Sequence, residues 1–199
     1  MKMTTLWAVV MMAGAGAWAK PLADGSAPVV TVCMESNGDF AILTAKIRAS
    51  QIFEQIPVRI AWKSARGCNQ PDAIRISLSP QTEKTLMPGA LAYAKPYQGT
   101  CIELFYDRIR SAVSADVLPA LLAHVLVHEI THILEGVSRH SETGIMKACW
   151  TPDDYRQMAG HPLPFAAMDI LLIRNSLKTR RQWLETLALA SGTGPSQLY

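Results

Sequence analysis

Two histidines and a glutamate stand close together in "HEITH", which runs from His128 to His132. The surrounding apolar residues recur with the period of a helix, so the two histidines, four residues apart, project from one face. Such a pair can bind one zinc ion at about 2.0–2.1 Å. Glu129 points about 100° away around the helix, so it does not compete for the metal.

Glu129 has the chemistry of a general base. Zinc lowers the pKa of bound water from about 15.7 towards about 7, within reach of a carboxylate. The same group can then pass the proton to a leaving amine. Chance occurrence of the pattern is the alternative, but polar groups on an apolar helix are costly without a role. The pattern therefore predicts a catalytic zinc site.

A catalytic zinc ion needs a third protein ligand and one open position. Gly136 can end the helix in the left-handed conformation, and His140 follows it. Glu135 and His161 are the alternative ligands. We expect Glu135 to be a solvated carboxylate at the helix end and His161 to be a loop residue.

Two more residues can support the metal. Met146, in "GIM", can place a soft apolar floor beneath the histidines, although a methionine taken alone is more often plain core. His124 lies one turn before His128 on the same face, where we expect it to pack behind the ligands rather than bind metal.

The stretch "HEITHILEGVSRHSETGIM" resembles the metzincin zinc peptidases, whose HExxHxxGxxH motif precedes a Met-turn. "HS" followed by "IM" is most similar to the matrixin branch, and the full spacing resembles exported bacterial proteins with HExxHxxxGxxxHSxxGIM. The resemblance implies three ligands, a base and a Met-turn residue: His128, His132, His140, Glu129 and Met146.

The spacing departs from the metzincin motif, because the glycine comes one residue late and the third histidine two residues late. An extra helical residue adds about 1.5 Å and rotates the helix exit by about 100°. An extra loop residue adds up to about 3.6 Å of reach, which can return His140 to the metal. No tyrosine stands two residues after Met146, so we expect no tyrosine ligand.

Patterning predicts the elements that position these residues. We expect strands at 29–35, 58–62, 73–79, 89–97 and 100–109. Asp39 is expected to cap a helix that ends before Pro57, and Ser114 or Asp116 to cap the helix of the histidines. Beyond it we predict a short helix that Thr151 caps, and one or two closing helices within residues 164–190.

This order of elements also resembles the metzincin fold, over residues 29–175. The resemblance implies an α/β (α+β) domain with a twisted, mostly parallel five-stranded sheet and an antiparallel edge strand, followed by the active-site helix, the Met-turn and C-terminal helices. We expect the edge strand to bind an extended peptide by strand addition. Its substrate-binding residues would be Gly89, Ala90, Leu91, Ala92 and Tyr93.

The first residues have the features of a signal peptide. Lys2 precedes a short apolar run, and Ala17 and Ala19 offer small residues to a signal peptidase. We therefore predict a signal peptide at 1–19, a linker at 20–28, a catalytic domain at 29–175, and a C-terminal helix with a flexible tail at 176–199. Such a chain is secreted or periplasmic, and its mature form stays off the membrane.

The four cysteines of an exported chain suggest two disulfides. Spacing leaves three connectivities open, and our working hypothesis pairs Cys33 with Cys68 and Cys101 with Cys149. The formal net charge of +3 is too small to indicate nucleic-acid binding.

We therefore expect a monomeric, secreted, zinc-dependent endopeptidase that acts on a peptide or protein. One alternative is a zinc hydrolase of a non-protein amide or a cell-wall peptide. A non-catalytic zinc-binding module is a second alternative, but a purely structural site needs no base such as Glu129.

Overall fold

A computed structural model of the chain describes residues 27–94 and 99–190. The elements are β1 (Val29–Met34), α1 (Phe40–Glu54), β2 (Arg59–Lys63), η1 (Ala65–Gly67), β3 (Ile74–Ser79), β4 (Ala92–Ala94), β5 (Cys101–Phe105), α2 (Tyr106–Ala112), α3 (Leu118–Glu135), α4 (Pro152–Gly160) and α5 (Ala167–Ala190). The predicted signal peptide, most of the predicted linker and the tail at 191–199 lie outside the described residues. So do residues 95–97 of the predicted edge strand.

The strands form one sheet in the order β2-β1-β3-β5-β4. β1 pairs in parallel with β2 and β3, and β3 pairs in parallel with β5. β4 runs antiparallel to β5 and stands at the edge. The mostly parallel five-stranded sheet with an antiparallel edge strand confirms the predicted fold class.

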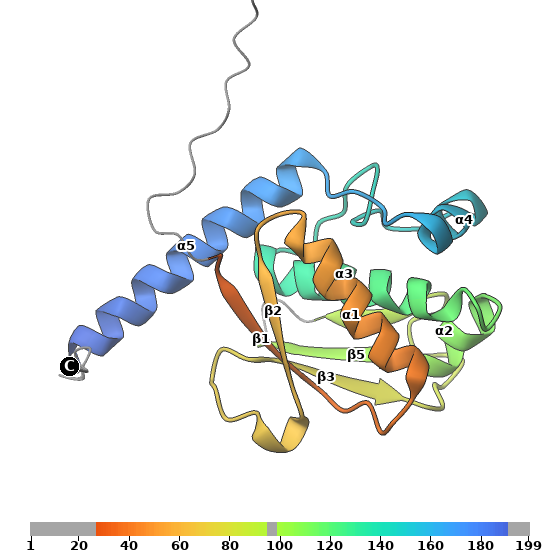
Figure 1. The fold of residues 1–199 in the computed structure, drawn as a ribbon, viewed down its shortest axis with the longest axis horizontal. Coiled ribbons are helices and arrows are strands. Elements are labelled where there is room, and N and C mark those ends of the chain that lie inside the picture. The colour runs from red at the N-terminus through yellow and green to blue at the C-terminus, as the bar shows by residue number, and fades with distance from the viewer. Residues whose placement is uncertain (1–26, 95–98, 191–199) are drawn as a thin grey trace, which may run out of the picture.

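Helices α1 and α3 pack against each other and cover the sheet (Figure 1). α1 turns Ala45, Ala49 and Phe53 into the core. α3 is buried on every side from Ala120 to Glu135, because the sheet, α1 and the later helices enclose it. This burial fixes the backbone that carries "HEITH". Within the described ranges, no helix is long and apolar enough to cross a membrane.

The ends of these helices were partly predictable. Asp39 caps α1 and accepts hydrogen bonds from the backbone of Ala41 and Ile42, as expected. Thr151 caps α4 in a capping box with Asp154. Gly136 ends α3 with a left-handed φ of 70°, and its N–H donates to His132 O.

The predicted cap of α3 is wrong. Val117 occupies the N-cap position and no side chain caps the helix. Ser114 contributes through its backbone instead, because its carbonyl oxygen accepts from the N–H groups of Val117 and Leu118. The second of these bonds satisfies the Leu118 amide, one of the donors at the helix start that have no partner within the helix.

Other boundaries also differ. The strand predicted at 100–109 ends at Phe105, where α2 begins. Tyr106 and Ile109 lie three residues apart and both face inward, which is helical spacing that the preceding alternation obscured. The described part of the edge strand is only Ala92–Ala94. The closing residues form one continuous helix, α5.

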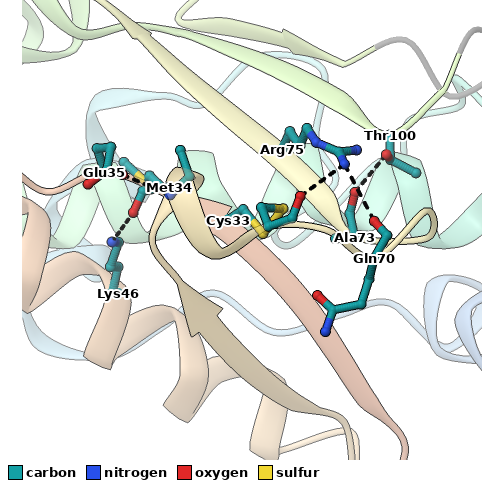
Figure 2. Close-up of a disulfide and its surroundings, with 10 residues drawn as sticks. Cys33, Met34, Glu35, Lys46, Gln70, Ala73, Arg75 and Thr100 are labelled. Carbon is teal, nitrogen blue, oxygen red and sulfur yellow. Dashed lines mark hydrogen bonds between the residues drawn. A yellow bond between two sulfur atoms is a disulfide. The ribbon is translucent and has the colours of Figure 1, made fainter.

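One predicted disulfide is present and the other is absent. Cys33 is bonded to Cys68, which ties the end of β1 to the segment after η1 (Figure 2). Cys101 and Cys149 are free and exposed, so the prediction that they pair is wrong. Cys101 is held in register with Arg75 on the sheet, whereas Cys149 stands on the loop before α4.

Hydrogen bonds surround the buried disulfide. Arg75 donates to the carbonyl oxygens of Cys68 and Gln70 (Figure 2). The Thr100 hydroxyl donates to the carbonyl oxygen of Ala73. Ala73 itself is buried against Cys33 and Cys68. The loop between β2 and β3 is therefore fixed by both covalent and polar contacts.

Candidate metal centre and its cleft

Three histidines converge at one end of the sheet. His128 and His132 project from α3, and His140 comes from the loop after Gly136. One ring nitrogen of each lies within 4.8 Å of the others. The ring centroids are 4.7 Å apart for His128 and His132, and 5.3 Å and 5.0 Å from each of these to His140. The late position of His140 thus does not keep it from the pair.

Backbone carbonyls orient the two helical histidines. His128 Nδ1 lies 2.9 Å from Ile145 O, and His132 Nδ1 lies 3.3 Å from Val137 O. A carbonyl can only accept, so both protons sit on Nδ1 and both Nε2 atoms keep a lone pair. This is the tautomer that a metal-binding Nε2 requires.

The donor atoms fit a zinc ion. The Nε2 atoms of His128 and His132 are 3.1 Å apart. With protons on both Nδ1 atoms, two lone pairs face each other across this distance, an arrangement that a cation between them stabilises. Two ligands at about 2.0–2.1 Å in a tetrahedron stand about 3.3 Å apart, close to the spacing found here.

Burial favours the neutral form of these histidines. It lowers the pKa of His128 to about 4, partly offset by the hydrogen bond to Ile145. It also lowers the pKa of His132 and that of the more exposed His140, where the charge of Arg139 lowers the pKa further. Neutral imidazoles are the form that binds metal.

Glu129 stands beside this group rather than within it. It is buried between α3 and the edge strand, and burial raises the pKa of its carboxyl group to about 8. A hydrogen bond from the backbone of Ala94 opposes that shift. Glu129 therefore faces the same cleft as the ligand nitrogens without joining them.

The cleft has a volume of about 520 Å³. It is lined by α3, including Val125, by the loop at 147–150 with Tyr155 of α4, and by the segment around β4. All five residues predicted to bind substrate line the cleft: Gly89, Ala90, Leu91, Ala92 and Tyr93.

Met146 lies in the turn that follows His140. It is fully buried, and its carbonyl oxygen accepts from Ser141 N at 2.7 Å. The preceding residue, Ile145, is the one that orients His128. Trp150 packs edge-on against the His128 ring with centroids 5.5 Å apart. This segment thus supports His128 through the backbone of Ile145 and through the ring of Trp150.

His124 does not join the metal-binding group. Its Nδ1 lies 2.7 Å from Ala120 O, and its Nε2 accepts from Leu163 N at 3.0 Å. Burial lowers its pKa to about 4. As a neutral ring it joins α3 to the segment that follows α4, and its ring also faces Trp150.

The two alternative ligands lie elsewhere. His161 is exposed at the end of α4. Glu135 is buried, so the expectation that it is solvated is wrong. Its pKa is raised to about 7 by burial and then by Asp169, against the charge of Arg139, whose Nη1 lies 3.8 Å away. Neither residue belongs to the three-histidine group.

Sequence patterns did not reveal a partly buried polar cluster next to His140. It consists of Glu135, Arg139, Ser141 and Asp169. Arg139 and Ser141 flank His140 in the sequence, and this position could have indicated that they contribute to the surroundings of His140. Asp169 carried no such signal, because only the fold brings the start of α5 to this loop.

Comparisons with known proteins agree with the geometry. No protein-family model matches the chain, and no curated protein matches it in sequence. Among solved structures, archaemetzincin from Methanopyrus kandleri superposes with a TM-score of 0.53 at 13% identity, covering 79% of this chain and 98% of that one. This similarity shows a shared fold, so the chain has a metzincin-like fold with a three-histidine group in it.

Proposed function

We propose that the chain is an exported, zinc-dependent endopeptidase in which three histidines hold the metal and Glu129 is the general base. The observation that carries the proposal is the convergence of His128, His132 and His140. The Nε2 atoms of the two histidines on α3 are unprotonated, and the buried carboxyl group of Glu129 lies beside the three rings. A structural zinc site has four protein ligands, whereas three histidines leave one position open for catalysis.

Zinc, when bound, would polarise the scissile carbonyl and acidify the attacking water. Glu129 would take the proton from that water and return it to the leaving amine. A dication beside the carboxyl group favours its charged form, which offsets the effect of burial on its pKa. The backbone hydrogen bond from Ala94 holds the carboxyl at the edge of the cleft.

The edge strand would bind the substrate. β4 pairs with β5 on one side and lines the cleft with the other, so an extended peptide can add to it. Such binding uses backbone hydrogen bonds along the peptide. It therefore favours a peptide or protein over a small amide that lacks an extended backbone.

Export is supported by two features. The chain begins with the pattern of a signal peptide, and Cys33 and Cys68 form a disulfide, which persists in oxidising compartments. We therefore place the mature chain outside the cytoplasm, in the periplasm or in the medium.

The test compares purified wild-type protein with Glu129→Gln. We expect one zinc per chain in both, and peptide cleavage slower by about 10²–10⁴-fold in the variant, since general acid–base catalysis contributes about that factor. Casein and a peptide library serve as substrates, with a chelator as the control. Cleavage of cell-wall peptides alone would point to the alternative hydrolase. Zinc binding without any hydrolysis would point to a binding module, and equal rates in the two proteins would refute the role of Glu129.

A further inference from the structure

His140 stands on an exposed loop, unlike the two histidines of α3. Its neighbours on both sides, Arg139 and Ser141, contact the same residue. That residue is Asp169, in the first turn of α5, which packs on α3. The residues before and after the third histidine are therefore both hydrogen-bonded to Asp169.

Asp169 is fully buried and has several hydrogen-bond donors. Its Oδ1 accepts from Arg139 Nη1 at 2.7 Å and from Ser141 Oγ at 2.6 Å, and its Oδ2 accepts from Ala166 N at 3.0 Å. Arg139 Nη2 also donates to Ser141 Oγ at 3.0 Å. Charge-assisted bonds of this kind are short and directional, so they fix the loop on both sides of His140.

The same part of the chain also supports the turn beneath the metal site. Ile145 N donates to Pro164 O at 3.0 Å, while Ile145 O accepts from His128 Nδ1. The segment from Pro164 to Asp169 thus holds both the loop of His140 and the turn that orients His128. The remaining histidine, His132, projects from α3, and its Nδ1 lies 3.3 Å from Val137 O, just beyond the helix end.

We propose that Asp169 is a positioning residue for the metal site, which through Arg139 and Ser141 holds His140 where the two histidines of α3 converge. This role rests on the proposed zinc function. Asp169 does not touch the metal in this scheme, and it acts only on the placement of the third ligand. The Glu135 carboxyl lies 3.8 Å from the same arginine and is not part of the three-histidine group.

The test measures zinc affinity by competition with a chromophoric chelator, on the full mature chain. The variants are Asp169→Ala, the double substitution Arg139→Gln with Ser141→Ala, and His140→Ala. Loss of an outer hydrogen-bond partner lowers metal affinity by about 10–100-fold, and we expect that loss in the first two variants. The visible absorption of the Co²⁺-loaded protein should shift in both towards the spectrum of His140→Ala.

The double variant keeps the bond from Ala166 N to Asp169 at the start of α5, and it serves if Asp169→Ala does not fold. Asp39→Asn is the matched control. Asp39 also accepts backbone hydrogen bonds at a helix start and one from a hydroxyl group, that of Tyr106, but it lies outside the cleft. We expect this control to keep the zinc affinity and Co²⁺ spectrum of the wild type.

The outcomes separate the two proposals. Zinc affinity and a Co²⁺ spectrum like the wild type in the double variant would overturn the positioning role while the proposed function stands. A wild-type chain that binds zinc no better than His140→Ala does would overturn the proposed function, and the positioning role with it.

Discussion

His128 and His132 join the three-histidine group from a helix that is buried on every side, whereas His140 joins it from an exposed loop. Packing positions the first two, because α3 cannot shift without disturbing the core. Polar contacts position the third, through Asp169 and the residues beside His140. The comparison teaches that a metal site can combine a rigid half with a half whose geometry depends on a few hydrogen bonds.

This difference predicts that replacing either His128 or His140 weakens zinc binding, but that only one of the two replacements lowers the stability of the metal-free protein. His128→Ala and His140→Ala should both weaken zinc binding by more than about 100-fold, since each removes a ligand and outer partners alone are worth 10–100-fold. Only His128→Ala should also lower the free energy of unfolding of the metal-free protein, by about 1–3 kcal/mol, because Ile145 O loses its buried donor. Chelator competition and urea unfolding measure the two effects. Equal losses of stability in His128→Ala and His140→Ala would contradict the division of the histidine group into a buried half and an exposed half.

The turn between the two halves offers a sharper contrast. Gly144 has a φ of 76°, and a Cβ there would lie 2.2 Å from Pro164 O. Gly144→Ala should therefore destabilise the metal-free protein by several kcal/mol and weaken zinc binding, because the strain falls on the turn that orients His128. Gly38→Ala is the control, since Gly38 has a φ of 75° with nothing near its Cβ position. It should cost only about 1–2 kcal/mol and leave zinc affinity unchanged. Similar unfolding energies for the two variants would count against this account.

The pH dependence of stability at His124, which lies behind the histidine group, tests the buried half of the site. Its pKa is lowered from 6.5 to about 4, so the unfolded chain takes up a proton before the folded chain does. Its contribution to stability is complete above about pH 6.5 and is lost as the pH falls through about 4, by up to about 3 kcal/mol. The stability difference between the wild type and His124→Gln, measured by urea unfolding of the metal-free protein, should narrow over that window. A difference that stays constant with pH would refute the buried neutral state of His124.

The same contrast explains what the sequence could predict. Local signals located α3, the cap at Asp39 and the capping box at Thr151, because each depends on residues within a few positions of one another. Helix geometry and the reach of a short loop allowed His140 to join the pair on α3, and the resemblance to the metzincin motif singled it out as the predicted third ligand.

Features that depend on distant segments were not predictable. Glu135 reads as a helix-end carboxylate, and only the arrival of α5 buries it. Asp169 lies 28 residues after Ser141, and no local pattern joins them. The pairing of Cys101 with Cys149 failed for a related reason, since an even number of cysteines carries no information on which strand or loop holds each thiol.

X-ray absorption at the zinc edge tests the central claim most directly. The fold brings three imidazoles together, so the zinc-loaded wild type should show scattering from three imidazole rings with nitrogens at about 2.0–2.1 Å and one further light-atom ligand. His140→Ala, loaded with zinc at high concentration, should show two rings. A wild-type spectrum with two rings that His140→Ala leaves unchanged would contradict the three-histidine site, and with it the proposed peptidase.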